Sequence, residues 1–213
     1  MDPSRFALVF PQSAFVPVVL GFFGLGTGYL IYGPQELFGS PARDAAVDRA
    51  TGVWGVFMPG LCQALAGIYL FVGLTWFQVF NDKALYMTAL AFSVYGIHWF
   101  ALGWNRYRQS DARTNGGMCV AFMIISILGM VVFYRIGAWP VGLLFTGLTA
   151  VYFFELFASV PIGRPGRVAG KGPVTVIGEK GLGSFRILTG LWLMYLTFAT
   201  TLNVASGYKL PGG

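Results

Sequence analysis

The stretch ALYMTALAFSVYGIHWFALGW, residues 84–104, contains no lysine, arginine, aspartate or glutamate. Its length matches the roughly 20 apolar residues that an α-helix needs to cross the hydrocarbon core of a bilayer. A backbone in lipid must also satisfy its hydrogen bonds within its own segment, which favours a helix. The stretch therefore predicts a membrane-spanning helix, and this helix carries the one histidine of the chain, His98.

Apolar stretches of similar length recur along the chain. Together they predict six spans at about residues 15–32, 52–74, 84–104, 117–134, 138–160 and 184–204. The connections are short except for residues 33–51 and 161–183, which are polar or rich in glycine and proline and are expected to be interfacial loops. We therefore expect an all-α integral membrane protein in which residues 1–213 form a single compact six-helix transmembrane domain.

The composition supports this class of protein. Hydrophobic residues make up 56% of the 213 residues and charged residues 10%, whereas soluble domains contain roughly 25% charged residues. The net charge of +6 comes from residues between the apolar stretches and forms no basic stripe, so we expect no nucleic-acid binding. The expected location is the cell membrane, with the lipid bilayer as the surroundings of a multi-pass protein.

The basic residues predict an orientation. Ten of the 14 lysines and arginines lie in the loops after the first, third and fifth spans, counting Arg186 at the mouth of the last span. The other four lie at the termini and in the remaining loops. The positive-inside rule then places both termini outside the cytoplasm.

Glycines mark the first predicted span. Gly24 and Gly28 stand four positions apart within GFFGLGTG, a spacing that lets a neighbouring helix approach closely. Two interpretations remain open, simple helix packing and a kink that lines a pathway.

The polar residues inside the spans exclude several chemistries. Haem and zinc sites need several ligands, and His98 has no acidic residue three or four positions away. A hydrolase would need a nucleophile beside an orienting base, which the spans do not supply. We therefore expect no metal, no cofactor and no enzymatic activity.

His98 and Glu155 are the notable ionisable residues inside the spans. Each lies about two thirds of the way along its span, His98 in the third and Glu155 in the fifth. Because these two spans cross the membrane in the same direction, we expect the two residues at comparable depths. Such residues usually face the protein interior or a water-filled cavity. They are interpreted either as buried groups that bond to each other or to backbone carbonyls, or as parts of a proton or anion path.

The second and third predicted spans carry more specific patterns. GVFMPGLCQALAGIYLFVGLTWF, residues 55–77, and ALYMTALAFSVYGIHWFAL, residues 84–102, resemble the G-x-x-Q-x-x-A-G and A-F-x-x-Y-G-x-x-W runs of the acetate uptake transporter (AceTr) family. LLFTGLTAVYFFELFA and the closing LTGLWLMYLTFATTLNVASGYKLPGG are similar to the fifth and sixth spans of that family. The first span differs more. Where the family has the signature Asn-Pro-Ala-Pro-Leu-Gly-Leu, this chain has AFVPVVL, and only Pro17 and Leu20 match.

The resemblance implies a homo-hexamer in a prokaryotic cell membrane, in which each subunit has its own pathway for acetate or similar small monocarboxylates. Succinate is a further candidate substrate, and the pathway would be a channel or a proton-coupled carrier. A mid-membrane constriction would be formed by Phe23, Tyr95 and Leu148, where apolar rings exclude bare ions by dewetting. Gln63 matches the second-span glutamine of the family and would offer an amide donor to a carboxylate.

The resemblance also places His98 and Glu155. His98 would lie one helical turn from Tyr95 in a vestibule beside the constriction, and Glu155 would lie on the same side, two turns beyond Leu148. There the pair would relay a proton with the substrate. The family resemblance implies cytoplasmic termini, in conflict with the charge count. Two other functions remain open, transport of a different small solute and a non-transporting structural or regulatory membrane subunit.

Overall fold

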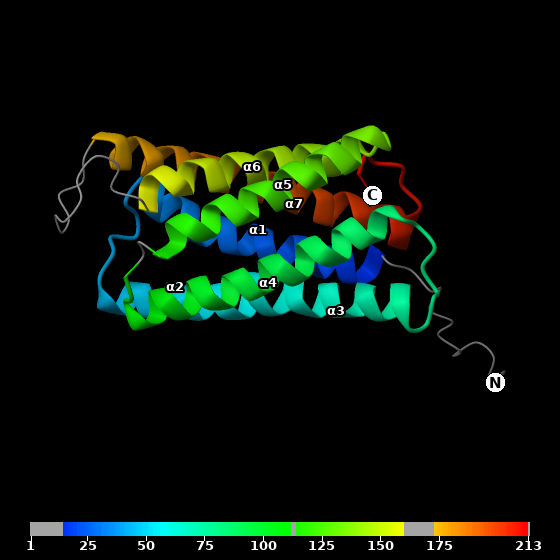
Figure 1. Ribbon diagram of the computed structural model, residues 1–213, viewed down its shortest axis with the longest axis horizontal. Coiled ribbons are helices and arrows are strands. Elements are labelled where there is room, and N and C mark those ends of the chain that lie inside the picture. The colour runs from blue at the N-terminus through cyan, green and yellow to red at the C-terminus, as the bar shows by residue number, and fades with distance from the viewer. Residues whose placement is uncertain (1–14, 112–113, 160–172, 213) are drawn as a thin grey trace.

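The computed structural model describes residues 15–111, 114–159 and 173–212. These residues are helical almost throughout, in the order α1 (Phe15–Leu37), α2 (Ala45–Gly55), the π-helix η2 (Val56–Leu61), α3 (Cys62–Thr75), α4 (Ala84–Arg108), α5 (Asn115–Arg135), α6 (Trp139–Ser159) and α7 (Pro173–Ser206). The segments α2, η2 and α3 follow one another without a break and form one rod (Figure 1). The predicted all-α architecture is confirmed for this part of the chain.

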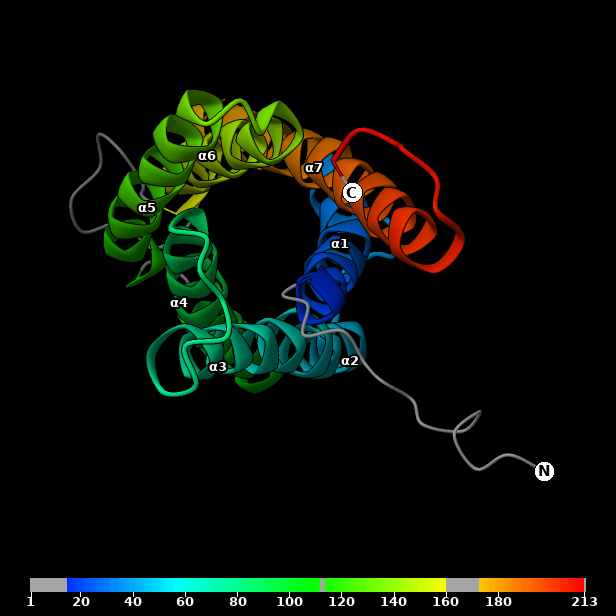
Figure 2. The ribbon, with the colours of Figure 1, turned by 90° about the vertical axis from the view of Figure 1, so that its right-hand side faces the viewer.

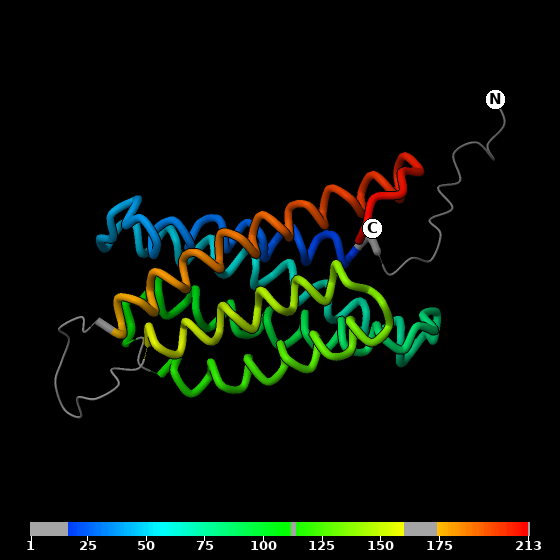
Figure 3. Tube along the Cα trace, turned by 90° about the horizontal axis from the view of Figure 1, so that it is seen from above, coloured from blue at the N-terminus to red at the C-terminus, as the bar shows by residue number. Residues whose placement is uncertain are grey.

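Many of these helices are suited to a membrane. Within the described ranges, five helical runs are long and apolar enough to cross one: Ala45–Thr75, Ala84–Arg108, Asn115–Arg135, Trp139–Ser159 and Val174–Ser206. Their outward faces carry exposed large apolar side chains such as Ile68, Ile97 and Leu188, as expected for surfaces that contact lipid or other subunits. Helix α1, which lies along α7 (Figure 3), is the remaining candidate for the predicted six spans.

The helices are arranged as a ring. Each helix packs on the next one in the order α1, α3, α4, α5, α6 and α7. Helix α7 then packs on α1 and closes the ring. Seen from one end, these helices surround a common axis (Figure 2). Buried hydrophobic side chains from α1, α4, α6 and α7 form much of the core. Any internal site must therefore lie among inward-facing side chains of several helices.

The paired glycines of α1 pack against the π-helix. A Cβ atom on Gly24 would come 2.5 Å from the carbonyl oxygen of Met58, and one on Gly28 would come 2.7 Å from Cγ of Pro59. Pro59 has no backbone N–H to donate within a helix, and the wider π-helical turn includes it without ending the rod. Close helix packing, the first of the two interpretations of this GxxxG spacing, is therefore confirmed.

Both long loops predicted from the sequence are shorter in the structure. Helix α1 continues to Leu37 and α2 begins at Ala45, so that much of 33–51 is helical. The Asp44 side chain starts α2, because it accepts hydrogen bonds from the backbone N–H groups of Ala46 and Val47, each at 2.8 Å. Helix α7 likewise includes 173–183, and the rest of that predicted loop lies outside the described residues.

The ends of the bundle differ in what they carry. Helix α1 begins at the same end at which the described chain finishes (Figure 1). The α1–α2 connection, the end of α4 and the start of α7 meet at the opposite end, which contains Arg43, Arg106 and Arg186. Which end faces the cytoplasm stays a prediction.

Candidate functional site

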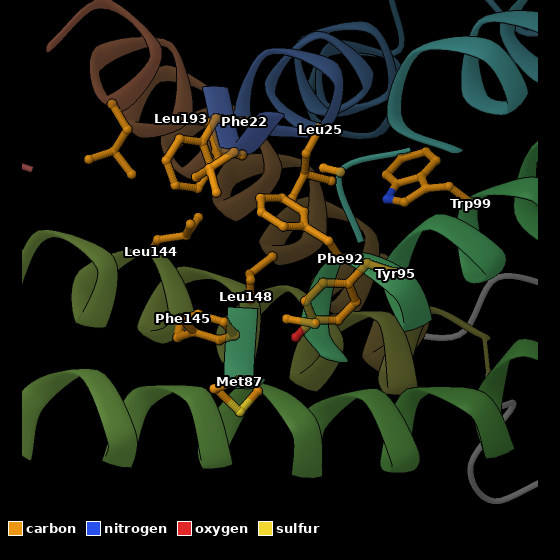
Figure 4. Packing of buried hydrophobic residues seen from close by; sticks show 14 of the residues in the cluster. Phe22, Leu25, Met87, Phe92, Tyr95, Trp99, Leu144, Phe145, Leu148 and Leu193 are labelled. Atoms are coloured by element: carbon orange, nitrogen blue, oxygen red, sulfur yellow. The ribbon is translucent and has the colours of Figure 1, made fainter. Parts of the chain in front are cut away.

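In the described part of the chain, two cavities follow one another along the axis of the helix ring. The first, which we name the apolar cavity, has a volume of about 200 Å³. Its walls come mainly from α1, α4, α6 and α7, and include Phe22, Leu25, Phe92, Tyr95, Leu148 and Leu193. These side chains point toward one another in Figure 4. The cavity therefore offers apolar surface to whatever enters it.

Gln63 adds a polar group to the wall of the apolar cavity. This residue of α3 is fully buried, with 0% of its surface exposed. Among the described residues, neither its Nε2 nor its Oε1 atom has a hydrogen-bond partner. Buried amides are normally paired, because an unpaired polar group loses its hydration without compensation. The Gln63 amide is therefore available to a ligand with hydrogen-bonding atoms.

The second cavity, which we name the charged cavity, has a volume of about 170 Å³ and lies toward the opposite end of the bundle. Its walls carry both signs of charge: Arg43, Arg106 and Arg186 together with Glu36, Asp48, Glu155 and Glu179. Arg106 Nε donates to Asp48 Oδ1 at 2.7 Å, and Arg43 Nε donates to the same oxygen at 3.0 Å. This cavity can therefore attract and orient an ionic ligand.

Four aromatic residues separate the two cavities, and we name Tyr29, His98, Trp99 and Tyr152 the aromatic layer. On α4, Tyr95 lines the apolar cavity and Leu102 the charged cavity, so His98 and Trp99 lie between them. On α1 and α6, Tyr29 and Tyr152 occupy the same intermediate position, and each is 1% exposed.

The rings of this layer contact one another. Tyr29 and Trp99 have ring centroids 5.8 Å apart, and those of His98 and Tyr152 are 5.7 Å apart. Figure 4 shows Trp99 apart from the side chains that line the apolar cavity, on the Tyr95 side of the group. Its Nε1 atom is buried and, within the described ranges, has no hydrogen-bond partner. The layer thus places packed, mainly apolar rings and an unpaired indole donor between the two cavities.

An ion cluster lies on the charged side of this layer. Arg186 of α7 is 2% exposed, and its Nη1 atom donates to Oε1 of Glu36 on α1. Its Nη2 atom is 3.2 Å from Oε2 of Glu155 on α6, close enough for an ion pair but without the alignment of a hydrogen bond. The guanidinium also lies over the rings of Tyr32 and Trp99, at 5.6 and 5.9 Å from their centroids.

The structure does not place the three residues of the predicted constriction together, and whether they narrow a pathway stays a prediction. Tyr95 and Leu148 are each 2% exposed and line the apolar cavity next to the aromatic layer. Phe23 does not join them, because its side chain is 42% exposed on the outer side of α1. The preceding residue, Phe22, is buried and lines the cavity instead. We therefore correct the α1 position of the proposed pathway from Phe23 to Phe22.

His98 and Glu155, which were expected either to bond to each other or to backbone carbonyls or to belong to a proton or anion path, are both buried. Glu155 has its ion pair with Arg186, and the described contacts of the His98 ring are to aromatic rings. The nearest of these is Phe122 on α5, at 4.7 Å between centroids. Among the contacts of the described residues, no hydrogen bond or ion pair joins His98 to Glu155, and a proton relay between them stays a prediction.

Arg186 and Glu36 are the residues that sequence reasoning missed. Arg186 lies just inside the predicted span 184–204 and counts with the loop charges under the positive-inside rule, whereas in the structure α7 already begins at Pro173 and Arg186 is buried. A signal was present, since the apolar positions Leu182 and Leu193 flank Arg186 at helical spacing and are themselves buried. Within the described ranges no group of three or more His, Cys, Asp or Glu residues is placed to hold a metal ion.

A solved structure of the bacterial acetate channel SatP is similar to this chain. The TM-score is 0.68 and the sequence identity 19%, over 92% of this chain and 98% of the channel. The chain shares the SatP fold. This agrees with the resemblance to the acetate uptake transporter family that its spans show. No protein-family model matches the chain, and no curated protein matches its sequence.

Proposed function

We propose that this protein conducts acetate or a similarly small monocarboxylate across a membrane, along a path that joins the apolar cavity to the charged cavity through the aromatic layer. The observation that carries the proposal is the order of these three regions along the axis of a helix ring with the SatP fold. A path through a membrane needs an internal route lined by several helices, and this arrangement offers one.

The apolar cavity suits the two ends of a short carboxylate. Its mainly apolar side chains accept a methyl group, and the Gln63 amide donates to the carboxylate. Because the unpaired Gln63 atoms are fully buried, a ligand that satisfies them recovers the cost of their desolvation. The Gln63 amide can pair with one carboxylate only. A larger anion with a second carboxylate would therefore place its second charge against apolar side chains such as Phe22, Leu25 or Leu148.

The aromatic layer supplies selectivity. Packed rings exclude water and fully hydrated ions, as hydrophobic constrictions do in other channels. The free Trp99 Nε1–H offers a hydrogen bond to a carboxylate that crosses the layer. On the far side, Arg186 provides a positive charge at the floor of the charged cavity. The anion would therefore meet a donor at each stage, from Gln63 to Trp99 to Arg186.

The family resemblance adds the setting of the proposal, a homo-hexamer in the cell membrane of a prokaryote. The exposed apolar faces of the helices suit both lipid and neighbouring subunits. Native mass spectrometry of the protein in detergent would count the subunits directly.

The test is uptake of labelled acetate into proteoliposomes of the purified protein, with empty liposomes as the background. Gln63→Leu should lower the uptake several-fold, whereas Leu65→Ala, on the exposed side of the same helix, should not change it. Repeating the assay with and without an inward proton gradient separates a channel from a proton-coupled carrier. Uptake no faster than in empty liposomes would contradict acetate as the substrate, and other small solutes would then be tested in the same vesicles.

A further inference from the structure

The ion cluster of Glu36, Arg186 and Glu155 contains more carboxylates than cations. One guanidinium on α7 faces a carboxylate from α1 and another from α6. The side chains are 12%, 3% and 5% exposed, in that order. Since buried charge is costly unless it is balanced, the cluster with both carboxylates ionised holds an unbalanced negative charge.

Among the described residues, no neighbouring cation forms an ion pair with either carboxylate of the cluster. Arg106 and Asp48 form a pair of their own, with side chains 10% and 12% exposed. Arg43 also contacts Asp48, but its side chain is 53% exposed, so solvent screens its charge. Other titratable groups that face the cluster are Tyr29 and Tyr32 from α1, His98 from α4, Cys119 from α5, Tyr152 from α6 and Glu179 from α7.

The cluster also has unused hydrogen-bonding atoms. In the part of the chain that the structure describes, Glu36 Oε2, Glu155 Oε2 and Arg186 Nε are buried without a hydrogen-bond partner. The two oxygens can accept a proton, and the Nε–H group can donate to an anion. All three residues line the charged cavity, so a ligand that enters it can reach them.

We propose that the Glu36–Arg186–Glu155 cluster binds one proton together with the carboxylate of the transported anion, the proton on a glutamate oxygen and the anion on Arg186. The proton comes from water in the charged cavity and adds to Oε2 of Glu36 or Glu155, and no covalent bond of the substrate changes. The anion then occupies the Nε edge of the guanidinium. The part of the proposal that concerns transport rests on the proposed function, whereas proton binding does not.

Charge balance couples the two ligands. A protonated glutamate brings the cluster to neutrality, and a bound monocarboxylate returns it to the charge that it had before. Without the proton, the same anion would add a second unbalanced charge to a buried site, which is far more costly. Acetate should therefore bind more tightly as the pH falls, by up to about tenfold for each pH unit, the limit for one coupled proton.

Infrared difference spectroscopy of the purified protein, with sodium acetate added at constant pH, tests the proposal. A protonated carboxyl group absorbs in a C=O band that is separate from ionised carboxylates. We expect acetate to raise this band in the wild type and in Asp44→Asn, a control at an exposed carboxylate outside both cavities, but not in the Glu36→Gln/Glu155→Gln double variant. Because the double variant mimics the protonated glutamates, its acetate affinity should also lose the pH dependence.

A second variant separates the anion site from the proton site. Arg186→Lys keeps one positive charge but presents no fork of donors, so it should weaken acetate binding several-fold and retain the carboxyl band at low pH. Size-exclusion chromatography and helical circular dichroism confirm that each variant is folded.

An acetate-induced band that persists in the double variant would overturn the proposal, as would an acetate affinity that does not vary with pH in the wild type. If acetate raises the band but no flux is measured in proteoliposomes, the site stands and the proposed function fails.

Discussion

The rings of Tyr95 and Tyr152 stack between α4 and α6, with centroids 5.9 Å apart and planes 16° from parallel. The Tyr95 hydroxyl bonds to Ser126 Oγ on α5 at 2.9 Å, and Ser126 in turn donates to the carbonyl of Phe122 at 2.7 Å. Tyr95 is thereby held by two other helices at the point where the apolar cavity meets the aromatic layer. We therefore expect the proposed pathway to open here by movement of the stack or by loss of this hydrogen bond.

The bond between Tyr95 and Ser126 should restrain the pathway. We expect Tyr95→Phe and Ser126→Ala each to lower stability by about 1 kcal/mol, the usual net value of one hydrogen bond, and to change acetate flux in the same direction. Because both remove the same bond, the double variant should resemble either single variant. Thermal unfolding and flux of the four proteins form a double-mutant cycle, in which strictly additive effects would show that the bond does not act as one unit.

Trp99 should set the width of the aromatic layer. Trp99→Ala leaves a hole among Tyr29, Tyr32 and His98, and should admit longer monocarboxylates such as butyrate. It should also lower the free energy of unfolding by roughly 3–5 kcal/mol, as large core truncations do. Trp104→Ala is the control on the same helix, since Trp104 is 56% exposed. An unchanged ratio of butyrate to acetate flux in Trp99→Ala would place the selectivity elsewhere.

The Arg186 ion cluster should make stability depend on pH in one particular variant. Arg186→Gln leaves the buried carboxylates of Glu36 and Glu155 without their cation, and should cost roughly 3–5 kcal/mol. The loss is largest at alkaline pH, where both are ionised, and shrinks as the pH falls and they are protonated. Melting curves by circular dichroism measure it, and the triple variant with Glu36→Gln and Glu155→Gln should recover stability. A loss that grows toward acid pH would contradict this account of the cluster.

The contact between α1 and the π-helix should tolerate no added methyl group. Gly28→Ala would place a Cβ atom 2.7 Å from Pro59, which forces α1 away from η2 and should lower the melting temperature. Gly117→Ala is the matched control, because a Cβ atom there meets nothing within 4 Å. That variant should be neutral or gain up to about 1 kcal/mol from the better helix propensity of alanine. Equal melting temperatures for the two variants would show that the close approach is not essential.

The length and polarity of the apolar stretches were enough to predict the helices and the inward position of several residues. The three-residue spacing of Tyr95 and His98, and the seven-residue spacing of Leu148 and Glu155, correctly indicated shared faces, and all four are buried. The inward position predicted for Phe23 belongs to Phe22. Two phenylalanines are adjacent in GFFGLG, and a shift of one residue rotates a helix position by about 100°. Pattern alone does not fix the rotation of a helix that is apolar on every side.

The ion cluster was beyond local reasoning for a different reason. Arg186 pairs with Glu36, 150 positions earlier in the chain, and such a pair forms only when α1 and α7 come together in the ring. A lone arginine at the edge of an apolar stretch is ordinarily read as a loop charge under the positive-inside rule. The helical spacing of Leu182 and Leu193 indicates that Arg186 faces inward, but only tertiary packing decides which carboxylates it meets.

The path through the apolar cavity is tested most directly by placing a cysteine at Phe22 and, in a second protein, at the adjacent Phe23, with Cys62 and Cys119 replaced by alanine. Acetate uptake into proteoliposomes is measured before and after treatment with methyl methanethiosulfonate, and mass spectrometry confirms the modification. We predict that modification lowers uptake through Phe22→Cys and leaves uptake through Phe23→Cys unchanged, because Phe22 lines the cavity and Phe23 faces outward. Equal uptake before and after complete modification of Phe22→Cys would contradict a solute path through this cavity.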